Sequence, residues 1–184
     1  GDFGVLTYAY ALEQLEADFY TKVVNGDQFG NIFSSEEQQV LSDLYAHEVI
    51  HREFFKAALS GALPNPSSQL LPGLEFNYDG VNFNNRLSVL ETAKVLEDTG
   101  VAAYNGAGRL ITSADYLLLA GKIVSVEARH ASAIRSLLNP NSKDFAGDDV
   151  VSATNGLDQA LAPAQIIAAA GGFFETPFTA NFLV

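Results

Sequence analysis

Apolar residues recur at intervals of three and four along four long stretches of the chain, as they do on one face of an α-helix. The pattern predicts helices over residues 5–25, 36–60, 86–111 and 114–138. Ser34 and Glu37 form a capping-box pattern at the start of the second helix. Asn139 and Pro140 end the fourth helix, because the residue before a proline avoids the helical conformation. A further short helix is predicted over residues 163–170, where a proline occupies the first position.

Residues 61–85 show no helical period and contain three prolines. Fully extended, this segment would span on the order of 80 Å, whereas a helix of about 24 residues is only about 36 Å long. The segment can therefore cross the whole length of a helical bundle and let the third helix run parallel to the second. One long crossover of this kind is an established topology of four-helix bundles.

The chain divides into a predicted bundle over residues 1–140 and a C-terminal tail over residues 141–184. The tail holds the short helix and ends in an apolar group: Phe173, Phe174, Phe178, Phe182, Leu183 and Val184. A segment this apolar is expected to be covered by other protein. We expect it to dock on its own bundle, or on a partner subunit in a homo-oligomer.

The motif Glu-x-x-His occurs twice, once at Glu48 and His51 and once at Glu127 and His130. This spacing puts a carboxylate and an imidazole on the same face of a helix. Apolar residues recur in step with both motifs, so this face is expected to point into the protein. Charged groups in a core are costly unless they are paired or bind a metal ion. We therefore expect a cation at these motifs.

Both motifs belong to an internal repeat. Glu13 and Tyr20 recur 84 residues later as a second glutamate and tyrosine, and the first Glu-x-x-His recurs 79 residues later. Two helical hairpins related by an approximate twofold axis would bring four glutamates and two histidines together, as in di-iron and di-manganese carboxylate bundles. The predicted metal ligands are Glu13, Glu48, His51, Glu97, Glu127 and His130, with Glu48 and Glu127 as bridges between two ions.

Four further residues lie near the predicted ligands in the sequence. Glu16 and His47 are alternate ligands, but the repeat places Gly100 opposite Glu16, which we therefore expect beside the ligands or partly in solvent. Tyr20 and Tyr104 lie two turns beyond the glutamates of the first and third helices and can tilt back toward the metal region. They are candidates for hydrogen bonding a ligand or passing an electron, and alternatively for filling the core.

His47, Glu48 and His51 also form the sequence H-E-x-x-H, in which zinc peptidases use both histidines as ligands and the glutamate as base. The position equivalent to His47 in the repeat is Val126, and no strand to hold a peptide is predicted. These two observations make a zinc peptidase the weaker interpretation. Another alternative is a core in which the histidines pair with glutamates and no metal binds.

Composition narrows the chemistry further. The chain has 22 acidic and 10 basic residues and a net charge of −12, which disfavours nucleic-acid binding. No apolar run reaches the length of about 18 residues needed to span a membrane. There is no cysteine, and carboxylates with imidazoles favour iron, manganese or zinc. Four carboxylates offset the charge of two divalent ions, so two Fe or two Mn ions are the expected cofactors.

The segments around these residues resemble those of ferritin-like domain proteins, in particular the subgroup that includes plant desiccation-related proteins. The resemblance rests on residues 12–20, 47–51, 96–100, 127–130 and 160–165, and so covers nearly the whole chain. It implies an all-α, ferritin-like four-helix bundle with one long crossover between the second and third helices, and a dinuclear metal centre. Members are commonly exported and the chain lacks an initiator methionine, so we expect an extracytoplasmic or secreted protein.

The expected function is metal binding at a di-iron or di-manganese carboxylate centre, with redox chemistry on dioxygen or hydrogen peroxide. Ferroxidase and manganese-catalase-like activities are the leading forms. The alternative is a non-enzymatic bundle that binds metal in a protective or structural role.

Overall fold

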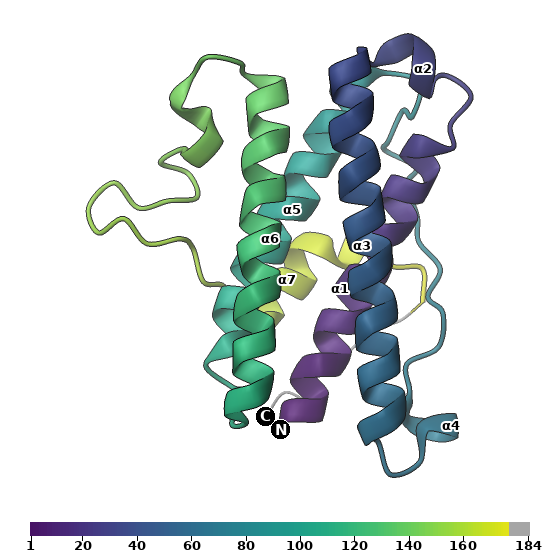
Figure 1. Ribbon diagram of the computed structural model, residues 1–184, viewed down its shortest axis with the longest axis vertical. Coiled ribbons are helices and arrows are strands. Elements are labelled where there is room, and N and C mark those ends of the chain that lie inside the picture. Colours follow the sequence, from purple (N-terminus) through teal and green to yellow (C-terminus); the bar gives the residue numbers. More distant parts are fainter. Residues whose placement is uncertain (177–184) are drawn as a thin grey trace.

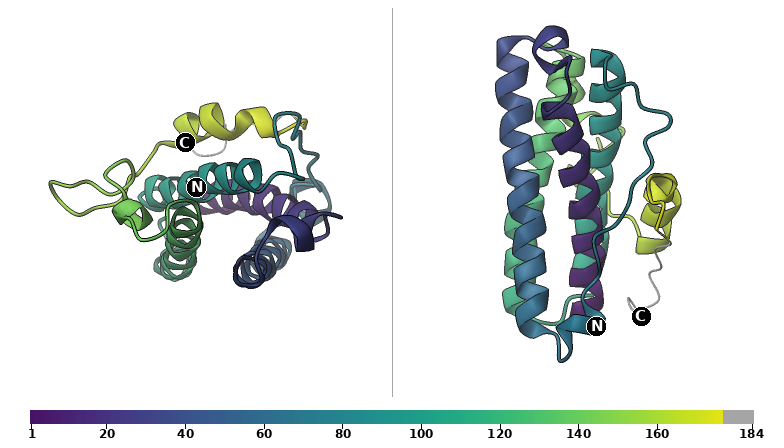
Figure 2. Two further views of the ribbon diagram at one scale, coloured as in Figure 1. Left: turned by 90° about the horizontal axis from the view of Figure 1, so that it is seen from above. Right: turned by 90° about the vertical axis from the view of Figure 1, so that its right-hand side faces the viewer.

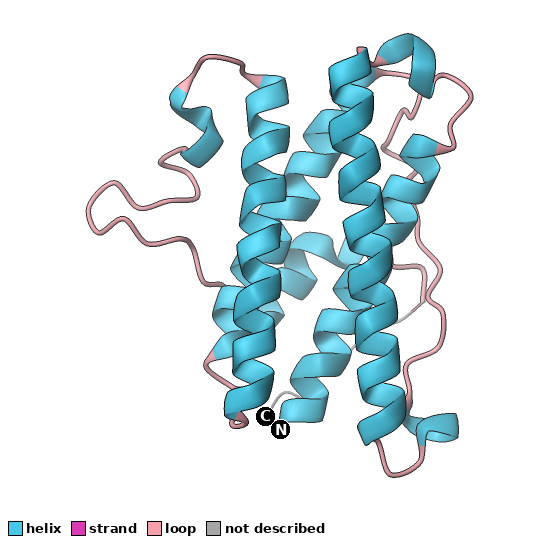
Figure 3. Cartoon of the chain, in the orientation of Figure 1, coloured by secondary structure: helices cyan, strands magenta, loops and turns pink. Residues whose placement is uncertain are grey.

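Four long helices form the body of the computed structural model, which describes residues 1–176 of the chain (Figure 1). They are α1 (Asp2–Val24), α3 (Ser35–Ala62), α5 (Arg86–Gly108) and α6 (Ala114–Leu138). The shorter elements are α2 (Phe29–Ile32), α4 (Pro66–Gln69), α7 (Pro163–Ala170) and the 3-10 turns η1 (Lys143–Ala146) and η2 (Gly171–Phe173). Figure 3 shows that loops connect these helices, and the described residues contain no strand. The predicted all-α bundle is confirmed.

Local sequence signals explain most helix boundaries. The Ser34 side chain accepts a hydrogen bond from the Glu37 amide, and the Glu37 carboxylate accepts one from the Ser34 amide, as in a capping box. Asn85 and Ser113 cap α5 and α6 through their side chains. The helix predicted to reach residue 111 ends at Gly108, because glycine weakens the helix there. The four-residue helices α2 and α4 are too short to show a period and were not predicted.

The segment between α3 and α5 runs along the bundle from one end to the other, so α3 and α5 are parallel as predicted (Figure 1). A buried amide on α1 fixes this segment. The Gln14 side chain donates to the Pro72 carbonyl at 3.3 Å and accepts from the Leu74 amide at 2.9 Å. The Tyr78 hydroxyl also donates to the Leu15 carbonyl at 3.3 Å. The crossover thus covers the outer face of α1.

The described part of the tail packs on the same side of the molecule. Figure 2 shows α7 lying across α1 and α5, on the side opposite α3 and α6. Ile166 is fully buried there, and the Leu161 amide donates to the Ala102 carbonyl of α5 at 3.0 Å. The Asn77 amide of the crossover donates to the Phe173 carbonyl at 2.8 Å. Phe178, Phe182, Leu183 and Val184 lie outside the described residues, and the homo-oligomer stays a prediction.

Arg135 on α6 fixes the loop that leads into the tail. Its guanidinium is 1% exposed and pairs with Asp98 of α5 and Asp149 of the loop, with nitrogen–oxygen distances between 2.7 and 3.0 Å. Paired bonds of this kind are strong and directional. They hold the pKa of Asp149 at about 2, well below its ordinary value. Within residues 1–176, no helix is long and apolar enough to cross a membrane.

The close approach of the tail to α5 predicts the effect of replacing Gly106. A Cβ atom there would overlap the Leu161 carbonyl oxygen, so the tail must shift. We expect Gly106→Ala to lower the free energy of unfolding by about 1–3 kcal/mol, measured by urea denaturation. Gly121→Ala is the matched control, because no atom lies within 4 Å of its Cβ position. The control should be neutral or more stable by up to about 1 kcal/mol. Equal effects of the two changes would contradict this packing.

Candidate metal centre

The four long helices bring a group of ionisable side chains together inside the bundle. The five glutamates of this group are at most 2% exposed, and His130 is 3% exposed. Each helix contributes: Glu13 and Glu16 from α1, Glu48 and His51 from α3, Glu97 from α5, Glu127 and His130 from α6. The helical spacing explains this convergence, because residues three apart share one face. All six predicted ligand side chains therefore lie in one cluster.

The cluster divides into two overlapping sets that could each hold a metal ion. Within each set, one potential ligand atom from every residue lies within 4.8 Å of the others. The first set is Glu13, Glu48, His51 and Glu127, and the second is Glu48, Glu97, Glu127 and His130. Glu48 and Glu127, the two predicted bridges, belong to both sets. Their assignment as bridging ligands stays a prediction.

Each imidazole turns its Nδ1 atom toward the carboxylates. His51 Nδ1 lies 3.0 Å from Glu127 Oε1, 3.3 Å from Glu13 Oε2 and 3.6 Å from Glu48 Oε2. His130 Nδ1 lies 2.8 Å from Glu48 Oε1 and 3.5 Å from Glu97 Oε2. Despite these short distances, both Nδ1 atoms and one or both oxygens of every glutamate lack a hydrogen-bond partner within the described residues. Buried polar atoms are normally paired, so this donor set fits a bound cation.

The electrostatics of the cluster also favour a cation. Burial raises the pKa of Glu13 to about 7, and burial together with repulsion from the other glutamates raises the pKa of Glu127 well above its usual range. Burial opposes ionisation of Glu48 too, but the imidazoles of His130 and His51 outweigh it and hold the pKa at about 2. Although burial acts against protonation of His51, the carboxylates around it raise its pKa to about 12. The cluster therefore attracts positive charge.

Two buried tyrosines connect the halves of the repeat. The Tyr20 hydroxyl donates to Glu97 Oε1 at 2.5 Å, and the Tyr104 hydroxyl donates to Glu13 Oε1. Each tyrosine therefore bonds the glutamate of the other repeat, an exchange that the repeat pattern alone did not predict. Burial and the adjacent glutamates raise the pKa of both phenols well above the usual range, so both remain donors. One oxygen of each glutamate is fixed, and the other faces the cluster.

Glu16 lies inside the protein rather than partly in solvent, which corrects that part of the sequence prediction. It is 2% exposed, and neither oxygen has a hydrogen-bond partner among the described residues. A Cβ atom at Gly100 would lie 3.0 Å from Glu16 Oε1 and 3.5 Å from Glu127 Oε2. The glycine thus makes room for a fifth carboxylate beside Glu127. The sequence already contained a signal for this arrangement, because the repeat matches Glu16 with Gly100.

His47 belongs to neither donor set among the described residues. Its Nδ1 atom lies 2.9 Å from Nε2 of His130, and the two rings stack with centroids 5.2 Å apart. It therefore contacts the ring nitrogen of His130 that does not face the carboxylates. The two histidines of H-E-x-x-H do not point into one donor set, which favours the dinuclear interpretation over a zinc peptidase.

Comparison with known proteins agrees with the fold and the cluster. Residues 1–140 match the family model of the ferritin-like domain, so the chain belongs to the ferritin-like domain family. No curated protein compared with the chain matches it. Membership of this family, together with buried carboxylates and histidines that could bind metal, supports a ferritin-like metal-binding protein.

The unpaired carboxylate of Glu16 predicts an unusual gain in stability. Replacing buried ionic groups by well-packed apolar residues of similar volume is often neutral or stabilising, by up to about 1–4 kcal/mol. We expect Glu16→Leu to raise the free energy of unfolding of the metal-free protein by this amount, measured by urea denaturation. Glu91→Leu, at an exposed position of α5, should change it by less than about 0.5 kcal/mol. A metal-free Glu16→Leu protein less stable than wild type would show that Glu16 has a stabilising partner.

Proposed function

We propose that this protein binds two iron or two manganese ions and uses them for redox chemistry on dioxygen or hydrogen peroxide. The proposed ligands are Glu13, Glu48, His51, Glu97, Glu127 and His130. The observation that carries this proposal is the pair of overlapping donor sets that share Glu48 and Glu127. The unpaired buried atoms of these residues support it, since a carboxylate and imidazole set of this kind suits iron and manganese.

Bound redox-active ions would supply or accept electrons, one per ion. If these residues held two ferrous ions, the ions could supply the two electrons that, with two protons from water, reduce dioxygen to hydrogen peroxide. In a catalase-like reaction, two molecules of hydrogen peroxide yield one dioxygen and two water molecules. The protein's own part is to orient the ligands: Tyr104 holds Glu13 and Tyr20 holds Glu97 through hydrogen bonds from their hydroxyls.

His47 has a positioning role in this proposal. A metal-bound histidine usually donates its second ring nitrogen to another group, which fixes its tautomer and orientation. Nε2 of His130 lies 2.9 Å from Nδ1 of His47. With His130 bound to metal through Nδ1, His47 would accept this hydrogen bond. It acts through His130 and is not itself a ligand.

Glu16 is a reserve ligand in the same proposal. Four carboxylates balance two divalent ions, and a fifth offsets the charge added when an ion is oxidised. Glu16 lies beside Glu127 with both oxygens unpaired within the described part of the chain. It can therefore stabilise the oxidised state without any new charge entering the core.

Metal-binding measurements on substituted proteins test the ligand assignment. We expect His51→Ala and Glu127→Ala to lower the bound iron or manganese from about two ions per chain to one or none, measured by elemental analysis after anaerobic loading. Their melting temperatures should fall relative to wild type only in metal-loaded samples. Glu53→Ala, at an exposed position of the same helix as His51, is the control and should keep about two ions. Full metal binding by His51→Ala and Glu127→Ala would refute the assignment.

Turnover assays separate the enzyme from the non-enzymatic alternative. Dioxygen consumption by the ferrous protein and peroxide dismutation by the manganese protein should be measured at equal metal occupancy. We expect at least one of the two to proceed catalytically. Two bound ions with no turnover in either assay would favour a protective or structural metal-binding bundle.

A further inference from the structure

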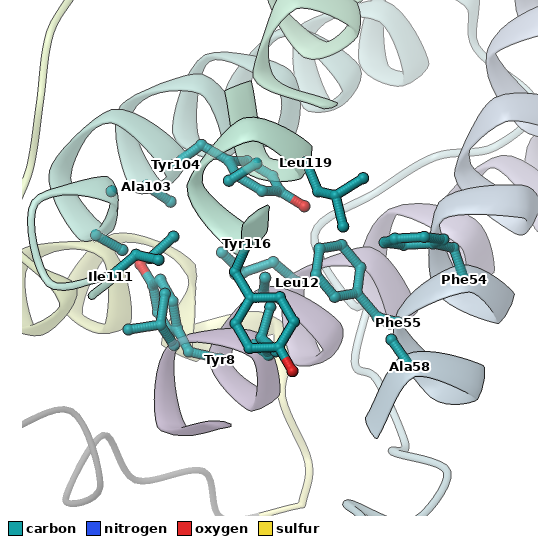
Figure 4. A pocket seen from close by; sticks show the side chains of 16 residues that line it. Tyr8, Leu12, Phe54, Phe55, Ala58, Ala103, Tyr104, Ile111, Tyr116 and Leu119 are labelled. Carbon is teal, nitrogen blue, oxygen red and sulfur yellow. The ribbon is translucent and has the colours of Figure 1, made fainter. Parts of the chain in front are cut away.

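An apolar chamber lies between the four long helices, next to the proposed centre (Figure 4). Residues of all four helices line it, among them Leu12, Phe55, Tyr104 and the alanines at positions 58, 103, 107 and 120. The surface that faces the space is almost entirely carbon, and the cavity volume is about 40 Å³. Phe54 and Leu119 also line it and are 37% and 36% exposed, so the chamber opens toward the surface between α3 and α6.

Tyr104 contacts both the chamber and the first donor set. The ring of Tyr104 forms part of the chamber wall, while the hydroxyl of the same residue donates to Glu13. Phe55 completes this wall, with its ring centroid 6.4 Å from that of Tyr104. A molecule held in the chamber therefore lies against the residue that orients a proposed ligand.

Several small residues of this lining are replaced by larger ones at the equivalent positions in the other half of the internal repeat. Residue offsets of 84 for α1 and α5 and 79 for α3 and α6 relate the two halves. Four of the five chamber alanines, at positions 58, 103, 107 and 120, have larger counterparts, in the same order: Leu137, Phe19, Val23 and Leu41; the fifth, Ala9, is matched by another alanine. In that half, Phe19, Val23 and Leu41 pack in one buried core cluster. At these four positions, the chamber half thus has smaller side chains than the other half.

The lining and the size of the chamber select its ligand. A cavity with apolar walls stays dry and binds apolar molecules. Hydrogen peroxide would lose its hydrogen bonds to water there without replacement, which is costly. A water molecule needs about 10–15 Å³ by this kind of measure, so about 40 Å³ suits an uncharged molecule of a few atoms. Drug-sized ligands occupy pockets of about 300 Å³ or more.

We propose that the chamber binds dioxygen and delivers it to the centre past Tyr104. The inference rests on the proposed function and names dioxygen, rather than hydrogen peroxide, as the oxidant. It also assigns the four alanines a role, because their counterparts in the other half would close the space. The substitutions that test the proposal are therefore those already present in the repeat.

Xenon is a suitable probe because it is an apolar atom of similar size, and its binding needs no metal. We expect xenon to shift the methyl NMR signals of Ala103 and Ala107 in the metal-free full-length protein. Ala58→Leu should abolish these shifts, and Ala57→Leu, an exposed neighbour outside the chamber lining, should leave them unchanged. Ala120→Leu tests the same point from α6, and thermal denaturation shows which variants remain folded. Absence of xenon binding to wild type would overturn the proposal.

A second readout uses the iron-loaded protein at equal occupancy. We expect Ala58→Leu to slow oxidation of the ferrous protein by dioxygen about tenfold, while oxidation by hydrogen peroxide and the Ala57→Leu control stay near wild type. If Ala58→Leu slowed oxidation by dioxygen and by hydrogen peroxide equally, this result would contradict dioxygen delivery through the chamber. An unchanged rate with both oxidants would contradict it too. A failure of the proposed function would give a different result. The wild-type protein would then fail to bind iron, while its binding of xenon would be unaffected.

Discussion

Five carboxylates are buried at the centre of one bundle, and the electrostatic cost of burying them is the main constraint on this structure. Two imidazoles, those of His51 and His130, face them and share the space. Uncompensated charge in a core is expensive, and the donor atoms that remain unpaired in the described structure converge rather than separate. A bound metal cation would compensate this charge. The central carboxylates are thus better suited to a metal-loaded protein than to a metal-free one.

The rest of the fold keeps this cluster away from water. Other segments also cover the outer face of α1, the helix that contributes Glu13 and Glu16. Gln14 fixes the crossover to that face, and α7 packs over it through Ile166. Arg135 anchors the loop that brings α7 into place. The long crossover and the tail therefore serve the same end as the helical core, which is to bury both sides of α1.

The two halves of the repeat are most informative where they differ. Glu16 is matched by Gly100, and this difference admits a fifth carboxylate. His47 is matched by Val126, and this difference gives His130 a hydrogen-bond partner that His51 lacks at the equivalent place. Four of the five alanines of the chamber are matched by larger residues. The repeat builds the donor sets, and its departures from symmetry give one half its open chamber.

Helical periodicity predicted the four long helices, and the spacing of Glu-x-x-His predicted which side chains would face the core. Other features depend on contacts between segments distant in the chain, which periodicity does not contain. The exchange of Tyr20 and Tyr104 between repeats is one example, and the pairing of Arg135 with Asp98 is another. The sequence left open whether Glu16 lies beside the ligands or partly in solvent, because its environment depends on a glycine of another helix.

The metal content of the protein purified from its native source, with no metal added, tests the central claim most directly. Elemental analysis should find about two iron or manganese ions per chain. About one zinc ion per chain would instead favour the H-E-x-x-H interpretation. No bound metal, and no uptake from ferrous or manganous salts under anaerobic conditions, would contradict the claim that metal ions compensate the buried carboxylates.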